Sequence, residues 1–283
     1  QAIANGVINA SYLQATTTNV GAISAVADGS LAPYGQFEAV AVGAYNLAVM
    51  YDSSIANSGS ISTSASATTD ISGSSGFLVA KAIAARAVNA SGRGEALVNN
   101  TGDITASAVV SQGYATAWGA IAQSGANGYG DAQIDNRGSI ASSATSAVGN
   151  SVTIGAYVQS GNTAGIVNHG DIAATSQGGR GYANVSSATA YATGAQVYGF
   201  AYGTGGASAS NDGTIQAHAS VEGGYTAVAT ALNIFGSSAT VDNAVGGMIY
   251  ASSDTQLFGV ARAVDILLGE QFARLVAPFP AQP

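Results

Sequence analysis

Cysteine is absent from this 283-residue chain, and charged residues are scarce. Without cysteine the chain has no disulfides, thiolate metal sites or cysteine nucleophiles. Charged residues make up 8% of the sequence, about a third of the share usual in globular proteins. Lys81 is the only lysine, and the formal net charge is −8. Nucleic-acid binding depends on clustered Lys and Arg, so we expect no nucleic-acid partner and no attraction to an anionic membrane surface.

Proline and long apolar runs are also scarce. Pro33 is the only proline before residue 278, which fits continuous β-ladders because proline cannot donate a ladder hydrogen bond. No apolar run approaches the roughly 18 residues that a spanning helix needs, so we expect no membrane-spanning segment in this chain. The sequence begins at Gln1, as a mature or partial chain would. It leaves open whether a signal peptide has been removed.

A short phrase, Asn-x-Gly followed by a polar or small residue and Ile, recurs along the chain. Its six full copies begin at Asn19, Asn57, Asn100, Asn136, Asn168 and Asn211, which lie 38, 43, 36, 32 and 43 residues apart. Degenerate copies are expected at Asn5 to Ile8 and, with an insertion, at Asn243 to Ile249. Repeats at such spacing are typical of solenoids and propellers.

The sequence between these phrases predicts three strands per repeat. In one central unit, residues 104–109, 114–122 and 131–135 alternate apolar and polar side chains between clusters of Gly, Ser and Asn. Alternation with a period of two over short runs indicates strands and not helices. Three strands and three corners per unit predict an all-β protein, a single parallel β-solenoid of about seven to eight coils over residues 1–253.

Small residues dominate the predicted core, because alternate positions of many strands are alanine. We expect the first residues of the phrases to stack into an amide ladder, as identical side chains do in cross-β stacks, and the isoleucines to stack into an aliphatic file. The phrase glycine is expected to take a positive φ at the corner. The predicted ladder residues are Asn19, Asn57, Asn100, Asn136, Asn168 and Asn211, with Ile23, Ile61, Ile104, Ile140, Ile172 and Ile215.

The C-terminal part has a different pattern. From residue 254 to residue 276 the apolar residues, such as Val260, Val264 and Leu268, follow a helical spacing. The sequence therefore predicts an amphipathic capping helix over residues 254–276, followed by a proline-rich extended tail over residues 277–283. A further strand from Phe258 to Val264 is the competing interpretation.

The phrase Asn-x-Gly-[Asp/Thr]-Ile-x-Ala, at residues 100–106, 168–174 and 211–217, resembles the repetitive passenger regions of bacterial autotransporters and related secreted solenoid adhesins. The strand from Tyr114 to Gly119 carries the same resemblance. The resemblance covers most of residues 1–253. It implies export, display at the bacterial cell surface or outside the cell, and adhesive or structural work.

No residue pattern of an active site is present. The sequence has no Gly-x-Ser-x-Gly elbow, phosphate-binding loop or His-Glu-x-x-His motif, and its two histidines, His169 and His218, fall at positions expected to be exposed. Asp103 and Asp171 occupy the same phrase position, which would place them about 9.6 Å apart if two coils separate them. That separation is near the upper range of inverting glycosidases, but Ser60, Ser139 and Thr214 at the equivalent positions favour an outward polar file in which hydroxyls separate like charges. We predict no catalytic residue, metal site or cofactor.

Aromatic residues gather on the second strand of each unit. They either shield the wall of the solenoid or form an interaction surface for glycans or a neighbouring molecule. The predicted surface consists of Tyr114, Trp118, Tyr157, Tyr191, Tyr198 and Tyr202.

The leading hypothesis is a non-enzymatic extracellular structural or adhesive protein that associates with copies of itself in a surface or filamentous assembly. A surface glycan or host surface is a further possible partner. The first alternative is a glycan-binding or glycan-cleaving β-helix similar to tailspikes and polysaccharide lyases. The second alternative is a passive spacer that holds another domain away from the cell.

Overall fold

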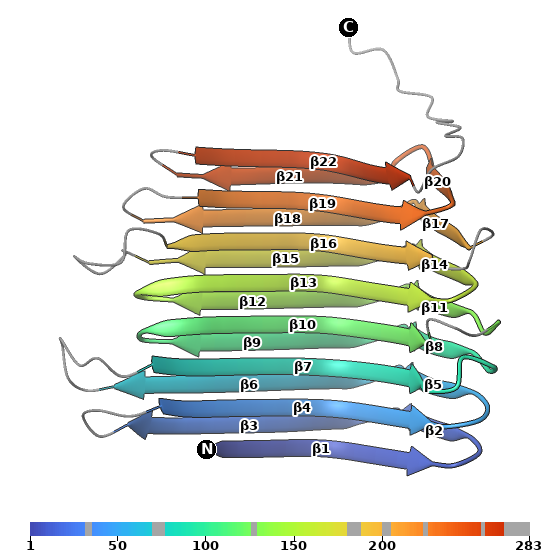
Figure 1. The fold of residues 1–283 in the computed structure, drawn as a ribbon, viewed down its shortest axis with the longest axis horizontal. Coiled ribbons are helices and arrows are strands. Elements are labelled where there is room, and N and C mark those ends of the chain that lie inside the picture. The colour runs from blue at the N-terminus through green and yellow to red at the C-terminus, as the bar shows by residue number, and fades with distance from the viewer. Residues whose placement is uncertain are drawn as a thin grey trace, which may run out of the picture.

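The computed structural model describes residues 1–31, 36–69, 77–125, 129–179, 188–199, 205–222, 226–255 and 258–268. Every regular element within these ranges is a β-strand, and the strands wind into a parallel β-solenoid (Figure 1). Each coil contributes one strand to each of three sheets, so that seven coils are followed by one further strand. The all-β solenoid fold predicted from the sequence is confirmed.

The three sheets follow the chain in strict order. Sheet A contains β1 (Ala2–Ser11), β4 (Gln36–Ala48), β7 (Phe77–Asn89), β10 (Gly113–Ser124), β13 (Gly149–Ser160), β16 (Thr189–Gly199), β19 (Thr226–Gly236) and β22 (Phe258–Leu268). Sheet B contains β2 (Ala15–Asn19), β5 (Ser53–Asn57), β8 (Ala96–Asn100), β11 (Ala132–Asn136), β14 (Thr163–Asn168), β17 (Gly206–Asn211) and β20 (Ser238–Asn243). Sheet C contains β3 (Ala22–Leu31), β6 (Ser60–Thr69), β9 (Asp103–Val110), β12 (Ser139–Ser146), β15 (Asp171–Gly178), β18 (Thr214–Val221) and β21 (Met248–Asp254).

The repeats set the register between coils. Ile104 pairs with Ile140, and Ile140 pairs with Ile172, so equivalent phrase residues stand directly above one another. Alternate residues of each strand face the interior, where small side chains such as Ala108, Ala117 and Ala144 fill a narrow core. Alanine suits this core because it loses essentially no rotamer entropy on burial.

Sheet A bends along a line that crosses every strand from β1 to β22. At the bend of β4, Gly43 and Ala44 are both buried, so the inward-facing phase of the strand shifts by one residue. A side chain at Gly43 would come within 2.7 Å of the Ile61 Cγ2 atom and 2.5 Å of the Ala84 carbonyl oxygen. The bend therefore brings a backbone without a side chain against the isoleucine file of sheet C.

The predicted capping helix is wrong where the structure describes this segment. Residues 258–268 form β22, which pairs in parallel with β19, while residues 269–276 and the predicted tail at residues 277–283 lie outside the described residues. The phase shift at the bend explains the error. Val264 pairs with Leu232 on the inner side, whereas Val260 pairs with Val228 on the outer side, so one bent strand gives a spacing that resembles a helix.

Two smaller sequence predictions are also wrong. Asn5 and Gly6 lie in the middle of β1, where Gly6 is a bend glycine and not a corner. The corner glycines do not have the expected positive φ, which occurs at Gly92, Gly113, Gly149 and Gly246 among the described residues. The degenerate copy at the other end does form a corner, because Asn243 pairs with Asn211 and Ile249 with Ile215.

Candidate functional site

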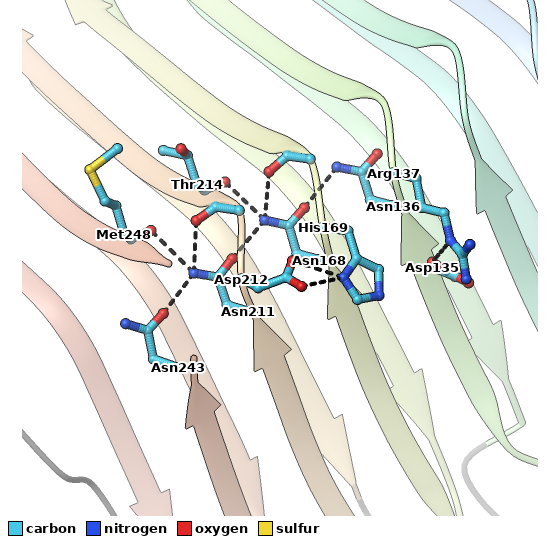
Figure 2. Close-up of polar contacts among 12 residues, drawn as sticks. Asp135, Asn136, Arg137, Asn168, His169, Asn211, Asp212, Thr214, Asn243 and Met248 are labelled. Carbon is cyan, nitrogen blue, oxygen red and sulfur yellow. Dashed lines mark hydrogen bonds and ion pairs between the residues drawn. The ribbon is translucent and has the colours of Figure 1, made fainter. Parts of the chain in front are cut away.

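An amide ladder runs through the corner between sheets B and C. The Asn100 Nδ2 atom donates to the Asn136 Oδ1 atom at 2.8 Å, and Asn136 Nδ2 donates to Asn168 Oδ1 at 2.8 Å. Figure 2 shows the ladder continuing from Asn168 through Asn211 to Asn243, with both steps at 2.7 Å. These asparagines end the sheet B strands, and the phrase turn that follows leaves each side chain pointing inward along the stack.

The ladder also holds the corner backbone. Asn100 Nδ2 donates to the Gly102 carbonyl oxygen at 2.9 Å and to the Ser139 carbonyl oxygen of the next coil at 3.0 Å. The six predicted asparagines are all buried, with exposures between 0% and 6%. Six donors that satisfy one another and the turn carbonyls make this corner a structural spine, and they leave little hydrogen-bonding capacity for a ligand.

Close packing explains the glycine of each phrase. A Cβ atom on Gly138 would lie 2.0 Å from the Gly102 carbonyl oxygen, and one on Gly102 would lie 2.0 Å from the Gly59 carbonyl oxygen. Real Cβ atoms do not approach oxygen so closely. The isoleucines that follow stack beneath this corner, and five of the six are 0% exposed, whereas Ile23 of the first coil is partly buried.

The variable residue of the phrase forms polar contacts on the surface of this corner. The His169 Nδ1 atom lies 2.8 Å from both carboxylate oxygens of Asp212, and Arg137 Nε lies 3.5 Å from Asp135 Oδ1 (Figure 2). The His169 and Asp212 side chains are 40% and 46% exposed. Exposed polar and charged pairs of this kind contribute little to stability, and both pairs connect surface residues at the corner.

The two candidate catalytic carboxylates, Asp103 and Asp171, belong to one outward file of sheet C. Asp103 and Asp171 both pair with Ser139, which stands between them. His218 faces outward on the same sheet, with its Nδ1 atom 2.8 Å from Ser252 Oγ. Within the described residues no group of three or more His, Asp or Glu side chains could hold a metal ion.

The outer side of sheet A is different in character. We call it the sheet A face: the outward side chains of β10 at Thr116, Trp118, Ile121 and Gln123, with those of β7, β13, β16, β19 and β22 in register with them. Sheet C instead presents an outward file of mostly hydroxyl side chains, which runs through Ser64, Ser107, Ser143, Thr175, His218 and Ser252.

An aromatic band crosses the sheet A face. The rings of Trp118 and Tyr157 have centroids 5.4 Å apart, those of Tyr157 and Tyr198 5.8 Å, and those of Tyr198 and Phe235 5.9 Å. These separations lie in the range that aromatic pairs favour, and the planes of all three pairs are tilted by 52–58°. The band spans four coils, from β10 to β19.

Polar side chains contact the residues of the aromatic band and one another. Arg86 lies 5.4 Å from the ring centre of Tyr45 and donates to Gln123 Oε1 at 2.9 Å, while Gln123 Nε2 donates to Gln159 Oε1 at 3.1 Å. The Tyr157 hydroxyl donates to the same Gln159 oxygen at 2.8 Å. Burial, together with the neighbouring Tyr198, raises the pKa of Tyr157 to about 12, against an opposing effect of Arg86. Gln123, Gln159 and the Tyr157 hydroxyl thus bond to one another in the part of the face from β10 to β19, whose strands contain no charged residue.

The residues predicted as an interaction surface separate into two groups. Trp118, Tyr157 and Tyr198 join the aromatic band, whereas Tyr114 and Tyr191 stand at the other end of the strands, each 42% exposed. Tyr202 lies outside the described residues. The sequence prediction missed Phe235, Arg86 and the glutamines Gln123 and Gln159. Their register with the tyrosines, which a full alignment of the repeats would have given, is the signal that identifies them.

No helix among the described residues is long and apolar enough to cross a membrane. The chain was compared with protein-family models, with curated proteins and with solved structures, and none of the three comparisons gave a match.

Proposed function

We propose that this chain is a non-enzymatic structural or adhesive protein, located outside the cell or on the bacterial cell surface, that works by associating with copies of itself. The observation that carries the proposal is the contrast between the faces of the solenoid. Sheet A presents an aromatic, uncharged centre, and sheet C presents hydroxyl-rich files. Aromatic residues are enriched, and charged residues depleted, at the centre of protein interfaces. The resemblance of the corner phrases to autotransporter passenger regions supports the location.

The rigid ladder supports a structural role. Each coil repeats the same amide, glycine and isoleucine contacts with its neighbours, so the stability of a solenoid increases with the number of coils and needs no bound ligand. The outward polar residues vary from coil to coil at the corner, as at Arg137, His169 and Asp212. A constant interior with a variable exterior suits a protein whose surface, and not an active site, does the work.

The test is the state of the purified full chain in solution. Analytical ultracentrifugation over a range of protein and salt concentrations, with electron microscopy of the same samples, is expected to show dimers or larger assemblies. Dispersed monomers under all conditions would contradict self-association and would leave the passive spacer as the simpler role.

Glycan binding at the same face is the second candidate. The half-buried Trp118 and Tyr157 rings beside the amides of Gln123 and Gln159 combine apolar surface with neutral hydrogen-bonding groups. Calorimetric titration with soluble polysaccharides is expected to give heat that Trp118→Ala abolishes if this candidate is correct. A glycan-cleaving activity would instead show as released reducing ends that Asp103→Ala or Asp171→Ala removes, and an inert wild-type protein would exclude cleavage of the glycans tested.

A further inference from the structure

We propose that two copies of this chain pair face to face through the sheet A face, with their solenoid axes antiparallel. The inference rests on the proposed function and adds the contact surface, the symmetry and the register of the pair. The charge, size and closed surface of the face support the pair, and four charged residues at its two flanks select the orientation.

The centre of the sheet A face is uncharged. The strands β10, β13, β16 and β19 contain no charged residue, although they span four consecutive coils. The whole chain carries a formal charge of −8, so two copies repel each other at most orientations. The centre of the sheet A face is a surface at which two copies can meet without placing like charges in contact.

The sheet A face has the area of a protein interface. Six strands, from β7 to β22, at about 4.8 Å spacing and roughly ten residues of about 3.3 Å each, cover on the order of 1,000 Å². A standard stable interface buries about 800 Å² on each partner. The face is therefore large enough for a stable pair without any other contact.

The sheet A face is filled by its own side chains and is not hollow. Although Ile121 points outward at the bend, it is only 2% exposed, and Ile83 and Ile154 on the neighbouring coils are 7% and 9% exposed. Since their neighbours include the Trp118 and Tyr157 rings, the bend is closed by side chains of the face itself. A closed, apolar surface favours another broad surface over a slender ligand.

The flanking charges select the antiparallel arrangement. Lys81 and Arg86 lie on β7, and Arg262 and Asp265 lie on β22. Arg86 and Asp265 occupy the same file, which runs through Ile121, Tyr157, Gln196 and Asn233. A two-fold axis along the strand direction, midway between β13 and β16, keeps each file opposite itself and places β7 opposite β22. Arg86 of each copy then faces Asp265 of the other.

The parallel arrangement lacks this complementarity. A two-fold axis along the solenoid would keep each coil opposite itself, so that Lys81 and Arg86 of both copies would meet at one level. Four cations at one level repel one another, and like-charge contacts at an interface oppose association by several kcal/mol. In the antiparallel pair, the cationic strand β7 of each copy faces the Arg262–Asp265 ion pair on β22 of the other copy. This ion pair has no net charge, and its Arg262 Nη1 and Asp265 Oδ2 atoms lie 3.0 Å apart.

The first experiment uses two matched threonine variants of the full chain in sedimentation equilibrium. Thr193→Lys places a charge at the centre of the sheet A face, on β16, and Thr175→Lys places the same charge on the outward side of sheet C. We expect dimerisation at least about tenfold weaker than wild type for Thr193→Lys and unchanged for Thr175→Lys, with circular dichroism of both variants as in the wild type.

The possible outcomes are distinct. A monomeric wild type contradicts the proposed function and this inference together. Association that survives Thr193→Lys, or that Thr175→Lys weakens as much, leaves self-association in place and overturns the assignment to the sheet A face. Monomers that bind a glycan through Trp118 also overturn it, in favour of the second candidate function.

The second experiment tests the orientation by charge reversal. Asp265→Arg is expected to weaken the pair because Arg86 of the partner then faces a cation, and adding Arg86→Asp to the same chain is expected to restore it. Failure of the double variant to recover, with its fold intact by circular dichroism, would contradict the antiparallel register.

Cross-linking gives an independent reading, since the chain has no native cysteine. Thr193→Cys and Val42→Cys lie in the same file. In the antiparallel pair the two copies of residue 193 lie about 5 Å apart along the stack, and the two copies of residue 42 about 34 Å apart. A short bis-maleimide is expected to cross-link Thr193→Cys alone, and equal cross-linking of both variants would overturn the antiparallel arrangement.

Discussion

The Asn100 side chain donates a hydrogen bond to the Asn136 side chain, and both residues are almost completely buried, with exposures of 1% and 0%. This contact repeats from coil to coil in one direction, with Nδ2 always donating toward the later coil. The side-chain amides of the ladder therefore all point in one direction, and the Oδ1 atom of each asparagine accepts the hydrogen bond that the preceding asparagine donates.

Asn100→Ala is expected to lower the free energy of unfolding by about 2 kcal/mol, because it leaves the buried Asn136 Oδ1 atom without its donor. Asn99→Ala is the matched control, since Asn99 is the preceding residue of β8 and is exposed; we expect a change within about 0.5 kcal/mol. Urea denaturation followed by circular dichroism measures both. Equal losses for the two variants would show that the ladder does not stabilise the fold.

Gly138→Ala is expected to destabilise the solenoid by at least about 2 kcal/mol, because the new Cβ atom would press on the Gly102 carbonyl oxygen and force the backbone to move. Gly21→Ala tests the same substitution at the first corner, where a Cβ atom would meet nothing within 4 Å. Thermal unfolding of both variants separates a steric requirement from an intrinsic preference of the turn for glycine. A similar loss at Gly21 would favour the intrinsic preference.

Ile140→Ala is expected to lower the free energy of unfolding by about 2–5 kcal/mol and Ile140→Val by about 0.5–1.5 kcal/mol, in line with deletions in well-packed cores. The narrow shaft limits relaxation around the cavity, since Ile140 packs against the bend at Gly119. Ile23→Ala in the partly buried first coil provides the comparison. A larger loss at Ile23 than at Ile140 would contradict the view that the stacked file carries this stabilisation.

The raised pKa of Tyr157 predicts that the folded protein loses stability at high pH. Its pKa is about 12 in the folded protein and 10.0 for the free side chain, so the unfolded chain releases this proton first and the free energy of unfolding falls as the pH rises from 10 toward 12. Tyr157→Phe is expected to remove this part of the pH dependence. Denaturation curves at pH 9, 10, 11 and 12 measure the effect, and an identical slope in both proteins would contradict it.

The corner phrase carried the fold prediction because one Asn-x-Gly-x-Ile sequence performs several structural tasks at once. Asn100 ends a sheet B strand and joins the amide ladder, Gly102 permits close approach of the neighbouring coil, and Ile104 enters the core. Repetition made these tasks visible in the sequence. The prediction of a positive φ for the glycine was wrong because close packing against the neighbouring coil, and not the backbone conformation, excludes a side chain there. A single repeat contains no information about the coil that packs against it.

The bend of sheet A is the feature that the sequence concealed. Gly43 and Gly119 are bend glycines, while Ala84 occupies the equivalent position in the coil between them, so no fixed motif marks the bend. The same phase shift turned β22 into an apparent amphipathic helix, with Val260 and Val264 four residues apart on opposite sides of the sheet. The sheet A face depends on cross-coil register, which periodicity within one strand does not reveal.

The connections of the solenoid differ in how much length they tolerate. From the first coil to the sixth, two residues join sheet B to sheet C, as between Asn100 and Asp103, whereas the step from sheet C to the next sheet A strand takes two residues after Val110 and ten after Gly178. Lengthening a connection costs little conformational entropy. The connections from sheet A to sheet B vary as well, from one residue after Gly236 to seven after Ser124. New sequence can therefore accumulate at both of these corners while the coils keep their alignment, and a lineage of such proteins could diversify its outline there without refolding its interior.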